Sequence, residues 1–166
     1  MKKILMLTLV FCGFAAAAFG QVSRTATATA TIVAPIAITK EVDMNFGNVA
    51  VSASAGTVVL TPANSRSVTG GCTLPATLGT VTAASFTVTG TSGYSYSIAL
   101  PSTPTTISSG GNTMTVSNFT SSPTPTGTLA GGTSTLTVGA TLNVAGGQAP
   151  GEYVSGTPFT VTVNYN

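Results

Sequence analysis

Few side chains of this 166-residue sequence could carry out acid–base or nucleophilic chemistry. Histidine is absent, which removes the commonest general base and the commonest metal ligand. Of the three acidic residues, Glu41 and Asp43 share a face if they lie on a strand, where they could bind Ca²⁺ weakly or act as an acid–base couple. Lys40 beside them favours a solvated turn instead, and Glu152 lies far away in the sequence. We therefore predict a protein that is not an enzyme, with no catalytic, cofactor-binding or metal-binding residues.

The cysteines add little chemistry. Cys12 falls in an apolar N-terminal run, and Cys72 has no histidine in the sequence to activate it as a nucleophile. If the N-terminal run is removed, a single cysteine remains and no intrachain disulfide can form. Two interpretations of Cys72 stay open: a small apolar residue packed in the core, or the site of an intermolecular link.

The N-terminal residues have the pattern of an export signal. Two lysines precede an apolar run over residues 4–18, and residues 18–20 read Ala-Phe-Gly, the small-x-small pattern at which signal peptidase cleaves. The run is too short to span a bilayer. We predict a signal peptide over residues 1–20, a mature domain over residues 21–166, and export to the periplasm, the cell surface or the medium, with no membrane insertion after cleavage.

The predicted mature chain is electrically neutral. Its charged residues are Arg24, Lys40, Arg66, Glu41, Asp43 and Glu152, three of each sign. Without a cluster of basic residues it lacks the means to neutralise phosphates, so we expect no nucleic-acid partner. The sequence is 43% hydrophobic, which argues against disorder, and a neutral surface favours self-association.

Residues 22–36 alternate with period two, which is typical of a strand. One face carries Ala26, Ala28, Ala30, Ile32 and Ala34, and the other carries the threonines at positions 25, 27, 29 and 31. Regularly spaced hydroxyls occur on ice-binding faces, but that function needs several such strands in register. The simpler interpretation is the solvated face of an amphipathic strand.

The C-terminal residues 159–165 alternate as well. Their apolar face consists of Phe159, Val161, Val163 and Tyr165, with two threonines and an asparagine between them. Burying these four side chains could contribute on the order of 6–10 kcal/mol. We therefore expect this strand to be a core element.

The remaining alternation predicts an all-β domain. Further short strands are expected over residues 36–39, 44–46 (before a turn at Gly47), 57–60, 85–89, 94–100, 113–116 and 134–143. The Gly90–Gly93 stretch indicates a hairpin between two of them, and a change of face near Gly139 indicates a bulge. The Ser/Thr/Gly/Pro-rich residues 102–111 and 121–132 are expected as surface loops. About seven to nine antiparallel strands predict a β-sandwich, with a barrel as the alternative.

Several short stretches together resemble a known group of proteins. They are Ile32-Val33-Ala34-Pro35-Ile36, Met44 to Val49, Phe86 to Gly90, Tyr94 to Ile98, Gly151-Glu152-Tyr153 and Phe159 to Tyr165. Their order is similar to that in a family of secreted bacterial β-domains of unknown function and in spore-coat-U-like and chaperone–usher pilin domains. The resemblance implies an immunoglobulin-like sandwich that lacks one strand, which the N-terminal extension of a neighbour supplies. Residues 22–36 also align with the domain's own first strand, so a self-complete sandwich stays open.

Two functions follow as expectations. The first is a structural subunit of an extracellular fibre, pilus or surface coat, built by edge-strand pairing with itself or with related subunits, with the help of a periplasmic chaperone and usher. In that case Ala26, Ala28, Ala30 and Ile32 form the donor face, and Phe159, Val161, Val163 and Tyr165 form the acceptor wall. The alternative is a monomeric secreted or surface-associated binding or adhesion module that recognises its target through residues 102–111 and 121–132.

Overall fold

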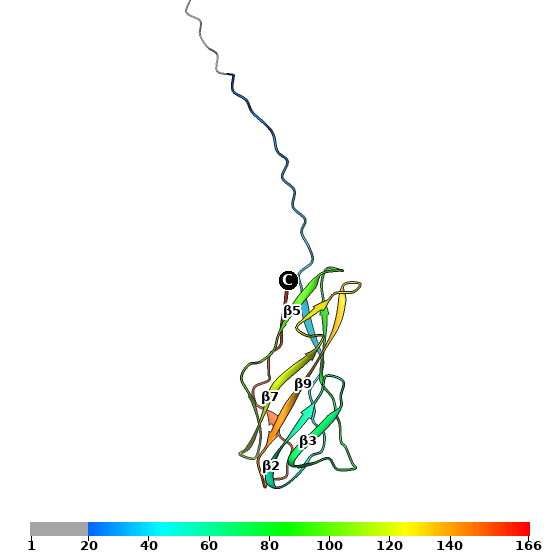
Figure 1. The fold of residues 1–166 in the computed structure, drawn as a ribbon, viewed down its shortest axis with the longest axis vertical. Coiled ribbons are helices and arrows are strands. Elements are labelled where there is room, and N and C mark those ends of the chain that lie inside the picture. Colours follow the sequence, from blue (N-terminus) through cyan, green and yellow to red (C-terminus); the bar gives the residue numbers. More distant parts are fainter. Residues whose placement is uncertain (1–19) are drawn as a thin grey trace, which may run out of the picture. The chain divides into compact units, whose positions relative to one another are not determined.

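The computed structural model describes residues 20–166, so all but the last residue of the predicted signal peptide lies outside the described residues. The chain divides at Val33 into two units. Residues 20–32 carry no helix or strand and are exposed. Residues 33–166 form the folded domain (Figure 1). Within residues 20–166 there is no helix with the length and apolar character needed to cross a membrane.

The folded domain is all-β, as predicted, and every strand pairing in it is antiparallel. Its strands are β1 (Ala37–Val42), β2 (Ala50–Leu60), β3 (Arg66–Thr73), β4 (Ala84–Thr89), β5 (Ser95–Ala99), β6 (Thr105–Ser109), β7 (Asn112–Ser122), β8 (Thr126–Thr128), β9 (Thr133–Val144), β10 (Val154–Ser155) and β11 (Thr162–Tyr165). Eleven strands exceed the expected seven to nine because several are short or lie in stretches expected as loops.

The strands form two sheets. The larger sheet has the order β1-β4-β9-β7-β6-β10, and β2 also pairs with β9 and carries β3 at its other edge. The smaller sheet has the order β11-β5-β8. Period-two alternation gives each sheet one apolar face, and burying these faces is what holds the sandwich together.

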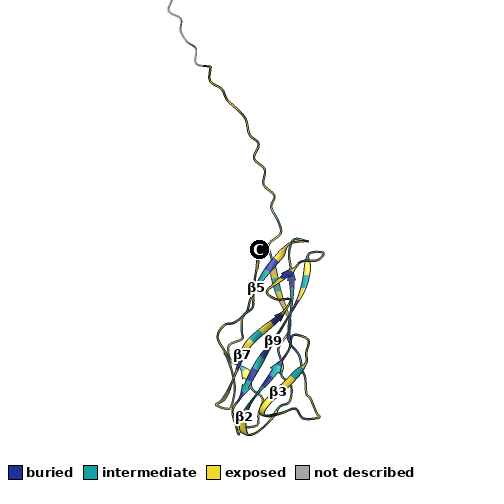
Figure 2. Cartoon of the chain, viewed as in Figure 1, coloured by how far each residue is buried: buried dark blue, intermediate teal, exposed yellow. Residues whose placement is uncertain are grey.

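The core has two parts, visible as the buried segments in Figure 2. The first lies between the two sheets, where Val88 and Leu136 of the larger sheet pack in one cluster with Tyr96 and Val163 of the smaller one. The second gathers on the larger sheet around Val58 and includes Cys72 and Leu142. The first cluster is the one to which the C-terminal strand contributes.

The expected opening strand over residues 22–36 is absent, and the first strand begins at Ala37. Period-two alternation is necessary for an amphipathic strand, but a strand also needs a neighbour for its backbone groups. Within the described chain, residues 20–36 take part in no strand pairing. The strand over residues 22–36 that the self-complete alternative requires is therefore not present in this structure.

The expected hairpin at Gly90–Gly93 is also wrong. The strands on its two sides, β4 and β5, belong to different sheets. The Gly90–Gly93 turn therefore carries the chain across the sandwich. Gly93 has a positive φ of 82°, which suits a glycine in such a turn.

The two expected loops contain strands. Residues 102–111 include β6, and residues 121–132 include the end of β7 and all of β8. Gly127 of β8 faces Tyr96 so closely that a β-carbon would collide with the tyrosine ring. The glycine in this stretch is needed for close packing, so a composition rich in turn-forming residues does not mark a loop here.

The bulge expected at Gly139 lies on the neighbouring strand. In β9 every second side chain points inward, and this alternation continues through Val138, Ala140 and Leu142 without a change of face. The register shift falls between Ser117 and Thr120 of β7, where Asn118 has a positive φ of 49°. A further strand, β3, was missed because its Gly-Gly pair suggests a turn.

Candidate assembly surface

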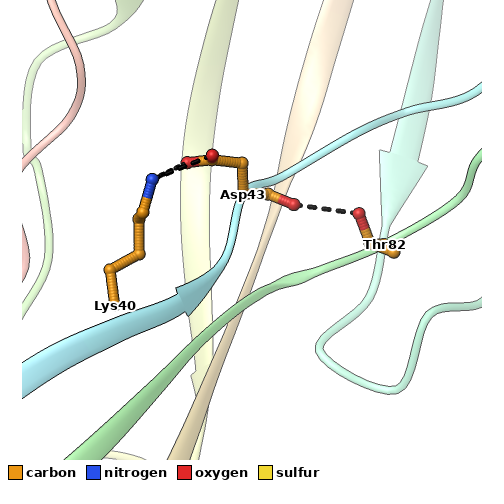
Figure 3. Close-up of polar contacts among 3 residues, drawn as sticks. All are labelled: Lys40, Asp43 and Thr82. Carbon is orange, nitrogen blue, oxygen red and sulfur yellow. Dashed lines mark hydrogen bonds and ion pairs between the residues drawn. The ribbon is translucent and has the colours of Figure 1, made fainter.

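Asp43 is engaged in polar contacts with Lys40 and Thr82. Lys40 Nζ lies 2.8 Å from each carboxylate oxygen of Asp43, and the Asp43 carbonyl accepts a hydrogen bond of 2.9 Å from Thr82 Oγ1 (Figure 3). The Lys40 and Asp43 side chains are 55% and 80% exposed, so solvent screens their ion pair. A register shift between Lys40 and Val42 leaves Glu41 out of the β1–β4 pairing. These side chains are solvated as expected, but Lys40 and Glu41 lie in β1 and not in a turn.

No metal centre can be built from the described part of the chain. Within residues 20–166, no three of its Cys, Asp or Glu side chains gather as a group that could hold an ion. Cys72 is only 3% exposed and packs in the second core cluster. Burial raises the pKa of the Cys72 thiol, because the thiolate is poorly solvated there. The residue behaves as a small apolar core side chain, the first of the two interpretations above.

The C-terminal residues 159–165 have the predicted inward face, although the strand itself, β11, covers only Thr162–Tyr165. Val161 and Val163 are 9% and 8% exposed, while Phe159 and Tyr165 are half-buried. The Phe159 ring lies 4.9 Å from the Phe119 ring, measured between centroids. All four predicted acceptor-wall residues therefore belong to the first core cluster or pack against it.

One edge of this strand is unpaired within the described chain. β11 pairs with β5 through Thr162–Tyr165, and the Asn166 amide donates to the Ser95 carbonyl. Backbone groups alternate sides along an antiparallel strand, so Val161, Val163 and Tyr165 direct theirs away from β5. Among residues 20–166, no strand pairs with that side of β11.

The first strand has an unpaired edge as well. β1 pairs with β4 on one side, and no described strand pairs with the other. β1 and β11 contact each other although no backbone ladder joins them. We call this line of contact, with its two unpaired edges, the β1–β11 seam. Unpaired edges of this kind are where another strand can add.

A hydrogen-bonded bridge closes one end of the seam. Tyr165 Oη accepts a hydrogen bond of 2.7 Å from the Thr91 amide and donates one of 2.8 Å to the Ala34 carbonyl. The Ala34 amide donates to Thr91 Oγ1 at 3.0 Å. Both backbone polar groups of Ala34 are thus held just before β1 begins.

The bridge explains a glycine next to it. A β-carbon on Gly90 would collide with the Tyr165 hydroxyl group. Sequence reasoning singled out Tyr165 but missed Ala34 and Thr91. The available signal was Gly90, which we interpreted as a hairpin glycine although its role is to make room for the tyrosine.

The predicted donor face belongs to a different unit of the chain from the acceptor wall. Ala26, Ala28, Ala30 and Ile32 lie before Val33, and the described residues there, 20–32, carry no strand. Ile32 is 93% exposed and Val22 is 77% exposed. Large apolar side chains left in water at these levels are stabilised when a partner covers them.

A family model described as "Domain of unknown function (DUF4402)" matches residues 36–165. The chain belongs to the DUF4402 family. Curated proteins gave no match to the chain, and neither did solved structures. The DUF4402 match begins next to β1 and ends at Tyr165, so it contains every strand of the domain. The alternating residues 22–32 lie outside the match, directly before it.

Proposed function

We propose that this DUF4402 protein is a non-catalytic structural subunit of an extracellular fibre, pilus or surface coat. It is exported, and its copies assemble by edge-strand pairing with each other or with related subunits, in the manner of pilin domains. Residues 22–32 of one copy supply a strand, and the β1–β11 seam of another copy accepts it. A periplasmic chaperone and usher would protect the unpaired edge before assembly.

One observation carries this proposal. Among residues 20–166, the alternating segment pairs with no strand, and two neighbouring edges of the folded domain, those of β1 and β11, pair with none either. Adding a strand satisfies backbone groups along its whole length and buries alternate side chains. The alanines bury little area each, so the backbone ladder and Ile32 supply most of the expected stabilisation.

The proposal is tested by charging one face of the segment at a time. In the mature protein, A28E/A30E places two carboxylates on the inward face of the donor strand, and burying them is costly. We expect this variant to lose assembly by at least about tenfold, since each buried unpaired charge costs several times the thermal energy. The readouts are negative-stain microscopy and the mass distribution from light scattering.

T27E/T29E is the matched control, because it adds the same charge to the same segment on the opposite face. It should assemble to within about threefold of the wild type, since exposed charges contribute little. An equal loss of assembly in both variants would show that the alanine face and the threonine face of the segment do not differ in their role, which would contradict the proposed strand pairing. A wild-type protein that stays monomeric at all concentrations would refute assembly itself.

The alternative function, a monomeric binding or adhesion module, has one observation in its favour. An open groove runs between residues 101–108 and residues 156–160, and it is lined by threonine, proline and Phe159 side chains. The first of the two ranges overlaps the recognition segment expected from the sequence. A strictly monomeric mature protein that adheres to cells through this groove would support the alternative.

A further inference from the structure

The β1–β11 seam has two different ends. β1 begins and β11 ends at the Tyr165–Ala34 bridge, so β1 runs away from the bridge, β11 runs towards it, and the two strands are antiparallel. At the far end, residues 156–161 have no backbone hydrogen bond to another described segment. Pro101 cannot donate to continue the β5–β11 ladder there. One end is bridged, and the other is open.

The bridge also fixes the point at which the N-terminal segment leaves the domain. To pair with its own seam, residues 22–32 would have to reverse direction within residues 33–36, and a tight reversal needs two to five adaptable residues. Both polar groups of Ala34 are occupied, by Thr91 Oγ1 and Tyr165 Oη. Pro35 follows with a fixed φ. Folding back therefore requires the bridge to break.

Chain length allows the segment to serve another copy. Residues 21–32 span about 40 Å when extended, at about 3.3 Å per residue. β1 has six residues and thus spans about 20 Å. The segment can cover the seam of a second copy and still leave several residues as a connector.

We propose that the Tyr165 bridge gives assembly its direction, an inference that rests on the proposed function. Because the bridge blocks one end, the segment of a second copy enters the seam at the open end, beside Phe159. Its residue 32 then lies at the open end and its residue 24 lies towards Tyr165, so it runs antiparallel to β11 and parallel to β1. Copies join head to tail, and such a heterologous contact propagates as an open filament.

Breaking the bridge should let the chain close. In the mature protein, Y165F keeps the aromatic ring, which packs against Tyr94 at 5.5 Å between centroids, and removes only the hydroxyl. Without it, residues 22–32 can fold back or exchange reciprocally in a two-fold dimer. We expect species larger than a dimer to fall about five- to tenfold, which corresponds to the loss of one to two hydrogen bonds. Mass photometry and negative-stain microscopy measure this distribution.

The matched control is Y153F. Tyr153 Oη also donates to a backbone carbonyl, that of Ala149 at 2.8 Å, and accepts from Gln148. It lies outside the bridge, so Y153F should keep the wild-type series of oligomers. If Y165F does not fold, the same measurements on T91V test the role of the bridge. T91V removes the hydroxyl that accepts the hydrogen bond from the Ala34 amide, and it leaves Tyr165 in place.

The outcomes separate the two proposals. Oligomers in the wild type with the same distribution in the bridge variant would overturn the role of the bridge and leave strand exchange standing. A wild type that forms only closed dimers would also overturn the direction inferred here. A wild type that is always monomeric would overturn both.

Discussion

Cys72 shows how a single buried side chain makes stability depend on pH. The thiol is 3% exposed, and burial raises its pKa. The folded state therefore holds the proton more tightly than the unfolded state does. Its contribution to the free energy of unfolding is fully present below the unfolded pKa, about 8.5, and is lost as the pH rises through the folded pKa.

We predict that the free energy of unfolding falls more between pH 8 and pH 10 in the wild type than in C72A. Urea unfolding at a series of pH values measures the difference between the two slopes. A thiol reagent should also modify the native chain more slowly than the unfolded chain by at least about a hundredfold, because the core must open first. The prediction would be contradicted if the free energy of unfolding changed equally with pH in the wild type and in C72A and if the reagent modified the native protein rapidly. Both results would show that the thiol is accessible to solvent.

Two glycines explain two of the wrong predictions made from the sequence at the scale of single residues. A β-carbon on Gly127 would meet the Tyr96 ring, and one on Gly90 would meet the Tyr165 hydroxyl. Each glycine makes room for a tyrosine that lies far away in the sequence. Local composition suggested turns because it carries no information about such distant partners.

The C-terminal segment is a core element of the domain. Val161 and Val163 belong to the core cluster between the sheets, and Phe159 packs on Phe119. Because Phe159 and Tyr165 are only half-buried, burying this face contributes roughly 4–9 kcal/mol. A typical domain has a net stability of about 5–15 kcal/mol. We therefore predict that deleting residues 159–166 abolishes cooperative unfolding, measured by calorimetry or by urea titration.

Deleting residues 21–32 is the control for that truncation. These residues belong to no strand and no core cluster of the domain. The shortened chain should melt cooperatively near the wild-type temperature. A cooperative transition in the chain that lacks residues 159–166 would contradict the prediction.

Strand faces could be predicted from the sequence far better than strand partners. The inward positions of residues 159–165 follow directly from alternation, and the structure confirms them. The assignment of β4 and β5 to different sheets does not follow, because it depends on contacts made across the whole chain. The same limit applies to residues 22–32, whose sequence alternates although no strand of the described chain pairs with them.

At the scale of the whole molecule, the zero net charge of residues 21–166 and the two edges left unpaired among the described residues both favour association. Soluble monomers usually keep a net charge and protect their edges with charged residues. Residues 159–165 carry no charge, and residues 22–36 carry only Arg24. These two stretches therefore place little charge against the proposed pairing between copies, whereas β1 carries Lys40 and Glu41 on the other side of the seam.

Export with removal of the leader would produce this neutral chain, since the net charge of +2 depends on the two lysines near the N-terminus. We predict that bacterial expression of the full sequence yields an exported product whose intact mass corresponds to residues 21–166. G20F places a large side chain where the peptidase requires a small one, so the precursor should accumulate. F19S alters the position between the two small residues and should be processed normally. An unprocessed wild-type chain in the cytoplasm would refute export, and equal processing of G20F would move the cleavage site elsewhere.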